Sequence, residues 1–143
     1  GLVTVMKNKA CEMYLKTIKS LEALGFNQYE ISNFSKPSFE SKHNTKYWIL
    51  DDYLGLGKSA HSLWHGKRFY YDTDWSLKSE GEVDIEEERI MLGLRLNCGI
   101  DKSLIKKDFS RFVKMGLMKE SENKIALTSE GMLVSNLIIG ELL

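Results

Sequence analysis

The sequence has 143 residues, of which 43% are hydrophobic and 28% charged, and its 20 Lys and Arg balance 20 Asp and Glu. A chain of this size forms one ordinary domain or two small ones that share a core. The formal net charge of zero argues against binding nucleic acid or an anionic membrane through bulk charge. Neither an apolar run of about 18 residues nor a basic segment followed by an apolar one is present, so we expect no membrane span and no secretory signal.

The two cysteines, Cys11 and Cys98, lie far apart in lysine- and leucine-rich surroundings and form no close motif. Scaffolds held together by disulfides are short and dense in cysteine. We therefore expect both thiols to be reduced and the protein to be cytoplasmic.

The first half of the sequence predicts a helix followed by short strands. Between residues 8 and 24, five residues at three- and four-residue spacing line one helix face: Ala10, Tyr14, Ile18, Leu21 and Leu24. Asn8 is a candidate N-cap, and Gly25 a candidate stop. Residues 26–34 are predicted to form a strand, the polar residues 35–46 a loop, and residues 53–57 a second strand.

The second half predicts a small helical unit. Residues 64–80 are aromatic-rich without a clear period, and the acidic residues 80–88 lead into a helix over 85–96, where acidic side chains suit the first turn. A helix marked by Leu104 and Ile105, another over 109–113, two strands over 117–120 and 124–128, and a final helix capped by Thr128 or Ser129 follow in the order of a winged-helix unit. A shift in composition near Trp75 suggests a domain boundary.

One cluster, His43-Asn44-Thr45-Lys46-Tyr47-Trp48, combines an imidazole with two large aromatic rings in the predicted loop. An imidazole nitrogen can bind haem iron axially, and the rings of Tyr47 and Trp48 could cover a flat macrocycle. From the residues alone, a histidine with only a structural role is favoured over a haem ligand.

A second cluster, residues 55–62, is a glycine-flanked strand end, where α/β proteins bind ligands. The pair Gly55 and Gly57 is a weak signal because glycines also serve tight turns. His61 and His65 are four residues apart, a spacing that suits metal ligands on a helix, but Gly66 and the strand-like context argue against a helix. No metal site is therefore predicted.

The run Tyr29 to Pro37, the following His-Asn-x-x-Tyr-Trp, and Tyr-Leu-Gly-x-Gly-x-x-Ala-His-Ser closely resemble one family. It is the oxygen-independent coproporphyrinogen III oxidase-like radical-SAM family, specifically its haem chaperone branch. The resemblance covers nearly all of the chain from about Asn8 onward. It implies an α+β fold: residues 1–74 as the C-terminal part of a partial (β/α) barrel, and residues 75–143 as a winged-helix-like C-terminal domain.

The resemblance also implies cofactors that this chain does not hold by itself. Family members open with a Cys-x-x-x-Cys-x-x-Cys loop for a four-iron cluster that binds SAM, and three thiolates are the minimum for that site. With two cysteines only, the chain is expected to be a C-terminal fragment without catalytic residues or cofactors of its own. The parent would hold a 4Fe–4S cluster and SAM, with haem as a further candidate.

Six residues acquire candidate roles from the resemblance. His61, Gly55 and Gly57 would lie on the SAM side of the barrel, although a strand-end histidine bonded to the backbone explains His61 equally well. His43, Tyr47 and Trp48 belong to the motif proposed for haem binding.

The resemblance leaves more than one function open. The leading interpretation is a haem chaperone whose partners are haem or porphyrin and haem-accepting proteins; the alternative is an oxidase that decarboxylates coproporphyrinogen III. A winged-helix DNA-binding module is a third interpretation, but residues 101–124 hold only seven Lys and Arg against four Asp and Glu, which argues against a nucleic-acid partner. Exposed barrel edges would allow a dimer.

Overall fold

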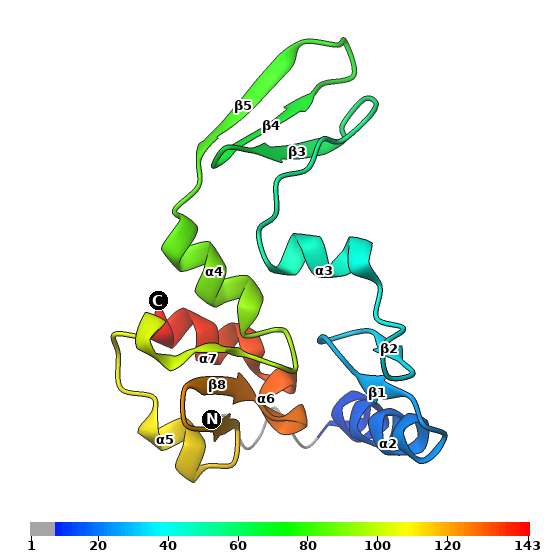
Figure 1. The fold of residues 1–143 in the computed structure, drawn as a ribbon, viewed down its shortest axis with the longest axis vertical. Helices are drawn as coiled ribbons and strands as arrows, with labels where there is room; N and C mark the ends of the chain where they lie inside the picture. Colours follow the sequence, from blue (N-terminus) through cyan, green and yellow to red (C-terminus); the bar gives the residue numbers. More distant parts are fainter. Residues whose placement is uncertain (1–7) are drawn as a thin grey trace.

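The computed structural model describes residues 8–143 as a mixed α/β protein (Figure 1). Expectations that rest on residues 1–7, namely the start of the first predicted domain and the lack of a signal segment, lie outside this part. The elements in chain order are α2 (Lys9–Ala23), β1 (Asn27–Gln28), β2 (Phe34–Ser35), α3 (Lys42–Trp48), β3 (His61–Trp64), β4 (Lys67–Tyr71), β5 (Leu77–Glu82), α4 (Ile85–Gly93), β6 (Ile100–Asp101), the 3-10 turn η1 (Lys102–Leu104), α5 (Ser110–Lys114), β7 (Met118–Glu120), β8 (Lys124–Leu127), α6 (Ser129–Leu133) and α7 (Ser135–Leu142). Among these helices none is both long and apolar enough to cross a membrane.

The N-terminal unit, residues 8–35, confirms the predicted first helix. Asn8 caps α2 by accepting a hydrogen bond from the Cys11 backbone N–H at 2.9 Å. Gly25 ends the helix at φ +82°, a conformation that suits glycine. The single strand predicted over residues 26–34 is wrong, because the chain turns back on itself after Gln28 and pairs β1 with β2 in an antiparallel hairpin.

The C-terminal module, residues 84–143, contains α4, a three-stranded sheet in the order β6-β8-β7, and the helices α5, α6 and α7. Three predictions are confirmed here: the helix after the acidic run, the hairpin of β7 and β8, and the Thr128 cap, whose hydroxyl accepts from the Gly131 N–H at 3.1 Å. The predicted helix at Leu104 and Ile105 is wrong, because Asp101 caps only one 3-10 turn and Ile105 is already extended. The predicted single last helix is divided at Val134, where ψ is +22°.

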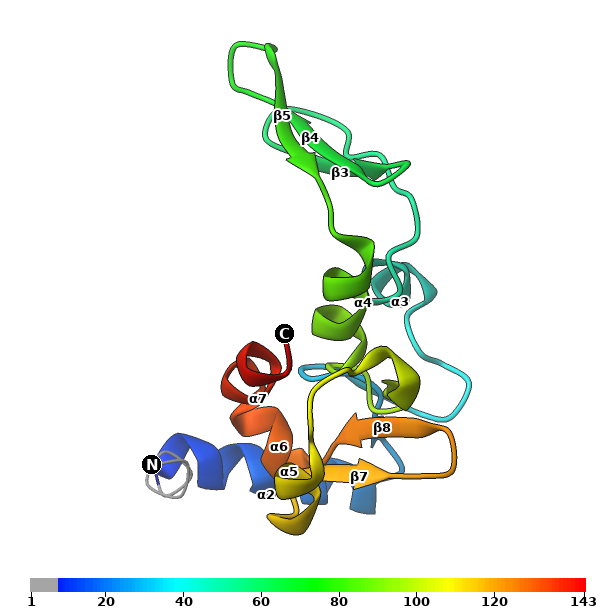
Figure 2. The ribbon, with the colours of Figure 1, turned by 90° about the vertical axis from the view of Figure 1, so that its left-hand side faces the viewer.

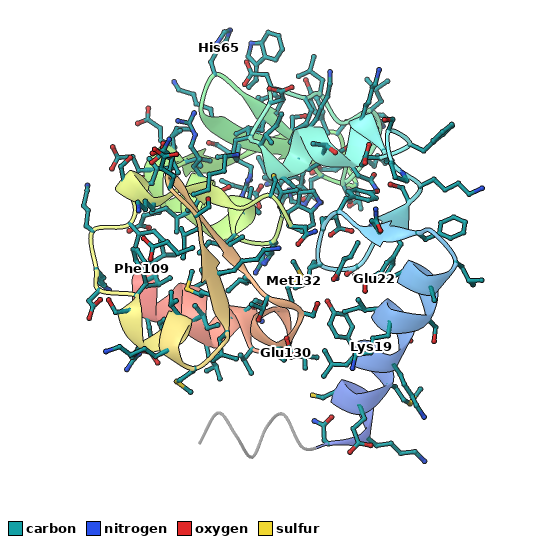
Figure 3. All side chains as sticks on the ribbon, turned by 60° about the horizontal axis from the view of Figure 1, so that its bottom comes forward. Lys19, Glu22, His65, Phe109, Glu130 and Met132 are labelled. Atoms are coloured by element: carbon teal, nitrogen blue, oxygen red, sulfur yellow. The ribbon has the colours of Figure 1, made fainter. Side chains whose placement is uncertain are left out.

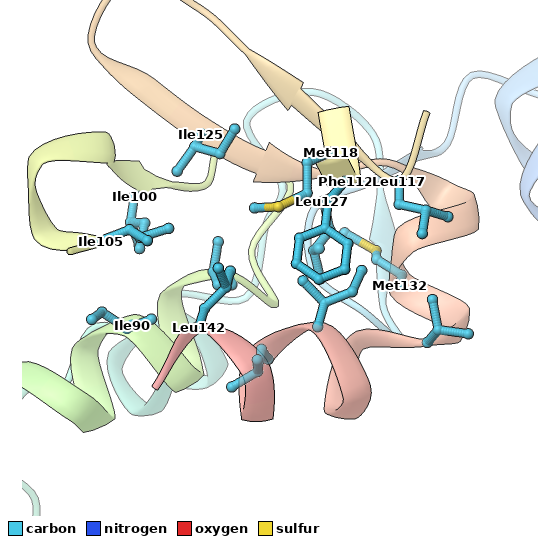
Figure 4. Packing of buried hydrophobic residues seen from close by; sticks show 14 residues of the cluster. Ile90, Ile100, Ile105, Phe112, Leu117, Met118, Ile125, Leu127, Met132 and Leu142 are labelled. Carbon is cyan, nitrogen blue, oxygen red and sulfur yellow. The ribbon is translucent and has the colours of Figure 1, made fainter. Parts of the chain in front are cut away.

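The main hydrophobic core belongs to the C-terminal module (Figure 4). Its fourteen buried side chains all lie between residues 90 and 142: Ile90, Leu94, Ile100, Ile105, Phe112, Leu117, Met118, Ile125, Leu127, Met132, Val134, Ile138, Ile139 and Leu142. Burial of apolar area on this scale is the principal source of folding free energy. The module therefore closes a core from its own residues.

The projecting sheet, strands β3 to β5 over residues 61–82, extends away from the rest of the molecule (Figures 1 and 2). It is an antiparallel meander in the order β3-β4-β5, and every residue of β5 is exposed. Only Ser62 and Leu63 of its strand residues are buried. The strand predicted over residues 53–57 is wrong: Tyr53 alone pairs with Leu63, and the Gly55 N–H donates to the Ser62 hydroxyl instead of to a strand.

The N-terminal unit contacts the C-terminal module through Tyr14 and Ile31, which pack against its core, and through polar contacts of the backbone. Glu30 forms an isolated bridge with Leu96, and the Asn97 N–H donates to the Tyr29 carbonyl at 3.0 Å. The Glu30 side chain is fully buried, and neither of its carboxylate oxygens has a hydrogen-bond partner among the described residues. The domain boundary predicted near Trp75 falls in the turn between β4 and β5. These two strands pair with each other in one sheet.

Candidate functional site

The cluster around His43 lies on a helix, so the predicted loop over residues 35–46 is wrong from Lys42 onward. The Ser41 hydroxyl caps α3 by accepting from the Asn44 N–H at 3.3 Å, and the Ser41 carbonyl accepts from the Thr45 N–H. Seven residues are too few for a clear apolar period, and the polar composition suggested a loop. Packing of α3 against α4 supplies the stability that so short a helix lacks in isolation.

The helix brings His43 and Tyr47 onto one face, because residues four apart are neighbours on a helix surface. Their polar atoms, His43 Nε2 and the Tyr47 hydroxyl, lie 3.1 Å apart. The ring of Tyr47 also packs edge-on against Tyr53, with centroids 4.7 Å apart. The His43 side chain is exposed, and its Nδ1 has no hydrogen-bond partner among the described residues. That nitrogen is available to a ligand without loss of the contact with Tyr47.

Behind this row of rings lies a hollow of about 300 Å³ between α3, the projecting sheet and α4. Its walls combine aromatic and aliphatic side chains with two guanidinium groups: Tyr47, Trp48, Leu50, Tyr53, Leu63, Arg68, Leu92 and Arg95. Burial raises the pKa of Tyr53 above its usual value, so its phenol stays neutral at physiological pH. We call this space the α3–α4 hollow.

The two arginines of the α3–α4 hollow differ in their partners. Arg68 forms a bidentate ion pair with Glu88 of α4, with both N···O distances at 2.9 Å. Arg95 donates to the Asn136 side-chain oxygen at 3.1 Å, and no carboxylate of the described residues pairs with it. The hollow therefore contains one neutralised and one uncompensated positive charge.

The residues predicted on the SAM side of the barrel lie at the start of the projecting sheet. His61 Nδ1 contacts Glu80 Oε2 at 2.8 Å, so its partner is a carboxylate and not the backbone. A Cβ on Gly55 would lie 2.3 Å from the His61 carbonyl oxygen, which explains the need for glycine at this position. Gly57 has φ +106° in the following turn. The atoms that approach Gly55 closely therefore belong to Ala60 and His61 of the same chain and not to a ligand.

The remaining histidine and the cysteines lie elsewhere. His65 projects from the sheet end (Figure 3), and its Nδ1 lies 3.8 Å from Asp52, whereas His61 pairs with Glu80. Within residues 8–143, no three His, Cys, Asp or Glu side chains are grouped as metal ligands. Cys11 is buried on α2 and Cys98 is exposed after α4, and two thiolates do not meet the minimum for a four-iron cluster. The residues of this chain do not fit that cofactor.

Tyr53 links α3 to the projecting sheet. It pairs with Leu63 of β3 through two backbone hydrogen bonds, and its ring contacts Tyr47 of α3. The run that begins at Tyr29 lies apart from them, against α2 and residues 96–97. The sequence interpretation missed Arg68 and Arg95, because they reach the hollow from β4 and the end of α4.

Comparisons with known proteins agree with the motifs. No family model matches the chain. The heme chaperone HemW of Bacillus subtilis is 32% identical over 96% of this chain and 43% of that protein, and HemW of Lactococcus lactis is 28% identical over 91% and 41%. The mitochondrial radical S-adenosyl methionine domain-containing protein 1 of Mus musculus is 46% identical over 64% of this chain and 26% of that protein. Among solved structures, coproporphyrinogen III oxidase (HemN) of Escherichia coli, a radical SAM enzyme, has a similar fold, with a TM-score of 0.57 at 18% identity over 88% of this chain and 39% of that one.

These similarities, the α/β fold and the three motifs define a radical-SAM type of protein. The chain belongs to the HemN-like, coproporphyrinogen III oxidase-like radical-SAM family. It spans about two fifths of the length of the curated relatives that it matches over most of its own length. The stretch aligned with the Bacillus protein has 164 positions, more than the 143 residues of the chain, so that relative carries residues with no counterpart here.

Proposed function

We propose that the chain is part of a haem-handling radical-SAM protein, and that His43 binds haem iron while Tyr47 and Trp48 flank the macrocycle. The observation that carries the proposal is the arrangement on α3: an exposed imidazole, with one ring nitrogen available, is held by Tyr47 beside a row of aromatic rings. Imidazole is a common axial ligand of haem iron, and aromatic faces pack well against a flat apolar ring. The names of the HemW relatives, which describe heme chaperones, support the same function.

In this proposal the chain corresponds to the C-terminal part of a longer protein. Residues 1–74 form the last part of a (β/α) barrel and residues 75–143 a winged-helix-like domain. The rest of the protein would hold a 4Fe–4S cluster and SAM, which supply radical chemistry when bound, and Gly55, Gly57 and His61 would lie on the SAM side. Haem-accepting proteins are the proposed partners, and exposed sheet edges would allow a dimer.

The alternative is a fragment of an oxidase that acts on coproporphyrinogen III. The fold shared with HemN supports it, but at 18% identity the likeness concerns the fold alone. Production of protoporphyrinogen by a longer protein that contains this chain would favour the oxidase over the chaperone.

The test is a haem titration of the chain monitored by its Soret absorption band. We expect His43→Ala to bind haem at least about tenfold more weakly, because a metal–ligand bond is lost. His65→Ala is the matched control, since that histidine is exposed and lies at the end of the projecting sheet; His61→Ala tests the other predicted position. Haem binding by His43→Ala equal to that of the wild type would contradict the proposal.

A further inference from the structure

We infer that the α3–α4 hollow receives the carboxylate-bearing edge of the tetrapyrrole, and that Arg95 is the residue that recognises the carboxylate. The inference rests on the proposed haem-handling function and adds to it a second contact, distinct from iron ligation by His43. The contact is with the carboxylate groups of the ligand, which a metal-free porphyrin also has.

The first argument is charge. Arg68 lines the hollow and is neutralised by Glu88, so the net positive charge there comes from Arg95. Arg95 is partly buried and uses one terminal nitrogen for Asn136, which leaves further N–H donors of its guanidinium without a partner among the described residues. A guanidinium fork matches the geometry of a carboxylate, and the pairing is strengthened where water is partly excluded.

The second argument is the chemistry of the walls. Tyr47, Trp48 and Tyr53 present aromatic surface, and three leucines complete an apolar lining next to the charge. A ligand complementary to this lining has a flat apolar body and an anionic group at its edge. Tetrapyrroles with propionate side chains combine both features.

The third argument is size and position. A volume of about 300 Å³ is at the small end of ligand pockets, so the hollow takes one edge of a macrocycle and not the whole ring. Tyr47 is both a wall of the hollow and the hydrogen-bond partner of His43, so the two proposed contacts share one side chain. Trp48 also lines a neighbouring hollow of about 360 Å³ with Ile49, which offers further apolar surface for the part of the ring outside.

The experiment compares metal-free protoporphyrin with its dimethyl ester, in fluorescence titrations of the 143-residue chain. We expect the wild type to bind the free acid about tenfold more tightly than the ester, because only the acid offers carboxylates to Arg95. Arg95→Ala should lose this preference through weaker binding of the acid, with binding of the ester unchanged. Arg111→Ala is the matched control: this arginine is exposed on α5, pairs with Glu141 and does not line the hollow.

Two further variants distinguish binding in the hollow from iron ligation by His43. Leu92→Trp, which fills the hollow from α4, should weaken both porphyrins, and it serves if Arg95→Ala does not fold. His43→Ala should alter the haem spectrum, because the proposed iron ligand is lost, but should keep the preference for the free acid over the ester, which Arg95 provides. Equal binding of acid and ester by the wild type, an unaltered preference in Arg95→Ala, or binding of neither porphyrin by the wild type would overturn the inference. The proposed function is decided separately, by the haem titration of the wild type and His43→Ala.

Discussion

The C-terminal module and the projecting sheet are built in opposite ways. The module encloses fourteen buried apolar side chains, with Phe112 and Leu94 almost completely removed from solvent. The sheet buries Leu63 but leaves Trp64 45% and Tyr71 40% exposed. Backbone hydrogen bonds alone contribute little net stability, so the sheet depends on what it packs against. The candidate site lies where the projecting sheet and α3 meet α4 of the C-terminal module.

The difference in burial between the module and the projecting sheet is consistent with a functional role for the exposed side chains. Side chains that must contact a ligand or another part of a longer protein cannot be covered by their own core. The core of the C-terminal module, in contrast, includes Ile90 of α4 and so holds that helix in place. Regions with few buried apolar contacts open locally at low free-energy cost. We therefore expect the sheet and α3 to exchange their amide protons before the module does.

The largest expected effect is a cavity in the module. Phe112→Ala should reduce the free energy of unfolding by about 3–5 kcal/mol, because the ring is 1% exposed and packs among other buried side chains. The control Tyr71→Ala in the projecting sheet, which removes an aromatic ring that is 40% exposed, should cost much less. Denaturant unfolding followed by circular dichroism measures both. Equal losses in the two variants would break the comparison between the regions.

A smaller effect is expected where the two regions are joined. Glu88→Gln leaves the Arg68 guanidinium without its ionic partner in a contact where the two side chains are 31% and 17% exposed. We expect β3 to β5 to lose about 1–3 kcal/mol of local stability, seen as faster hydrogen exchange, while amides around Ile138 keep their protection. Glu86→Gln is the matched control, since its pair with Lys106 is exposed. Equal exchange in the two variants would show that the ion pair does not hold the sheet.

The smallest effect is a pH dependence confined to the module. Hydrogen bonds from the Ser103 side chain and backbone lower the pKa of Asp101 below its usual 3.8. Because the folded-state pKa is the lower one, the stabilisation is complete above about pH 4 and is lost as the pH falls through the folded value. Asp101→Asn should reduce the acid dependence of unfolding.

The matched control for this pH effect is Asp74→Asn. Asp74 accepts a similar turn hydrogen bond from the Ser76 N–H, but it lies in the projecting sheet. The hydrogen bonds from Ser76 lower the pKa of Asp74 as well, so this variant should change the acid dependence of hydrogen exchange in the projecting sheet and leave that of the module amides as in the wild type. The same acid dependence in wild type and Asp101→Asn would exclude a role for this carboxylate.

Local signals explain which elements could be predicted. The helix after Asn8 has its cap, its apolar face and its glycine stop within one segment, and the hairpin of β7 and β8 has two apolar runs around a polar turn. The helix α3 has none of these except its Ser41 cap, so its polar residues suggested a loop. Residues 53–57 have the composition of a strand but no partner strand beyond Tyr53.

For this chain, the sequence by itself determined the family, through motifs whose order and spacing need no structure, and the residues His43, Tyr47 and Trp48 as a candidate site. The tertiary structure alone decided that these residues lie on a helix and that Arg95, 47 positions after Trp48, lines the same hollow as Tyr47 and Trp48. It also decided that Glu30 is buried without a hydrogen-bond partner in the described part of the chain. The physical reason is that caps and periodicity act between neighbours in sequence, whereas burial and charge pairing depend on which distant segments pack together.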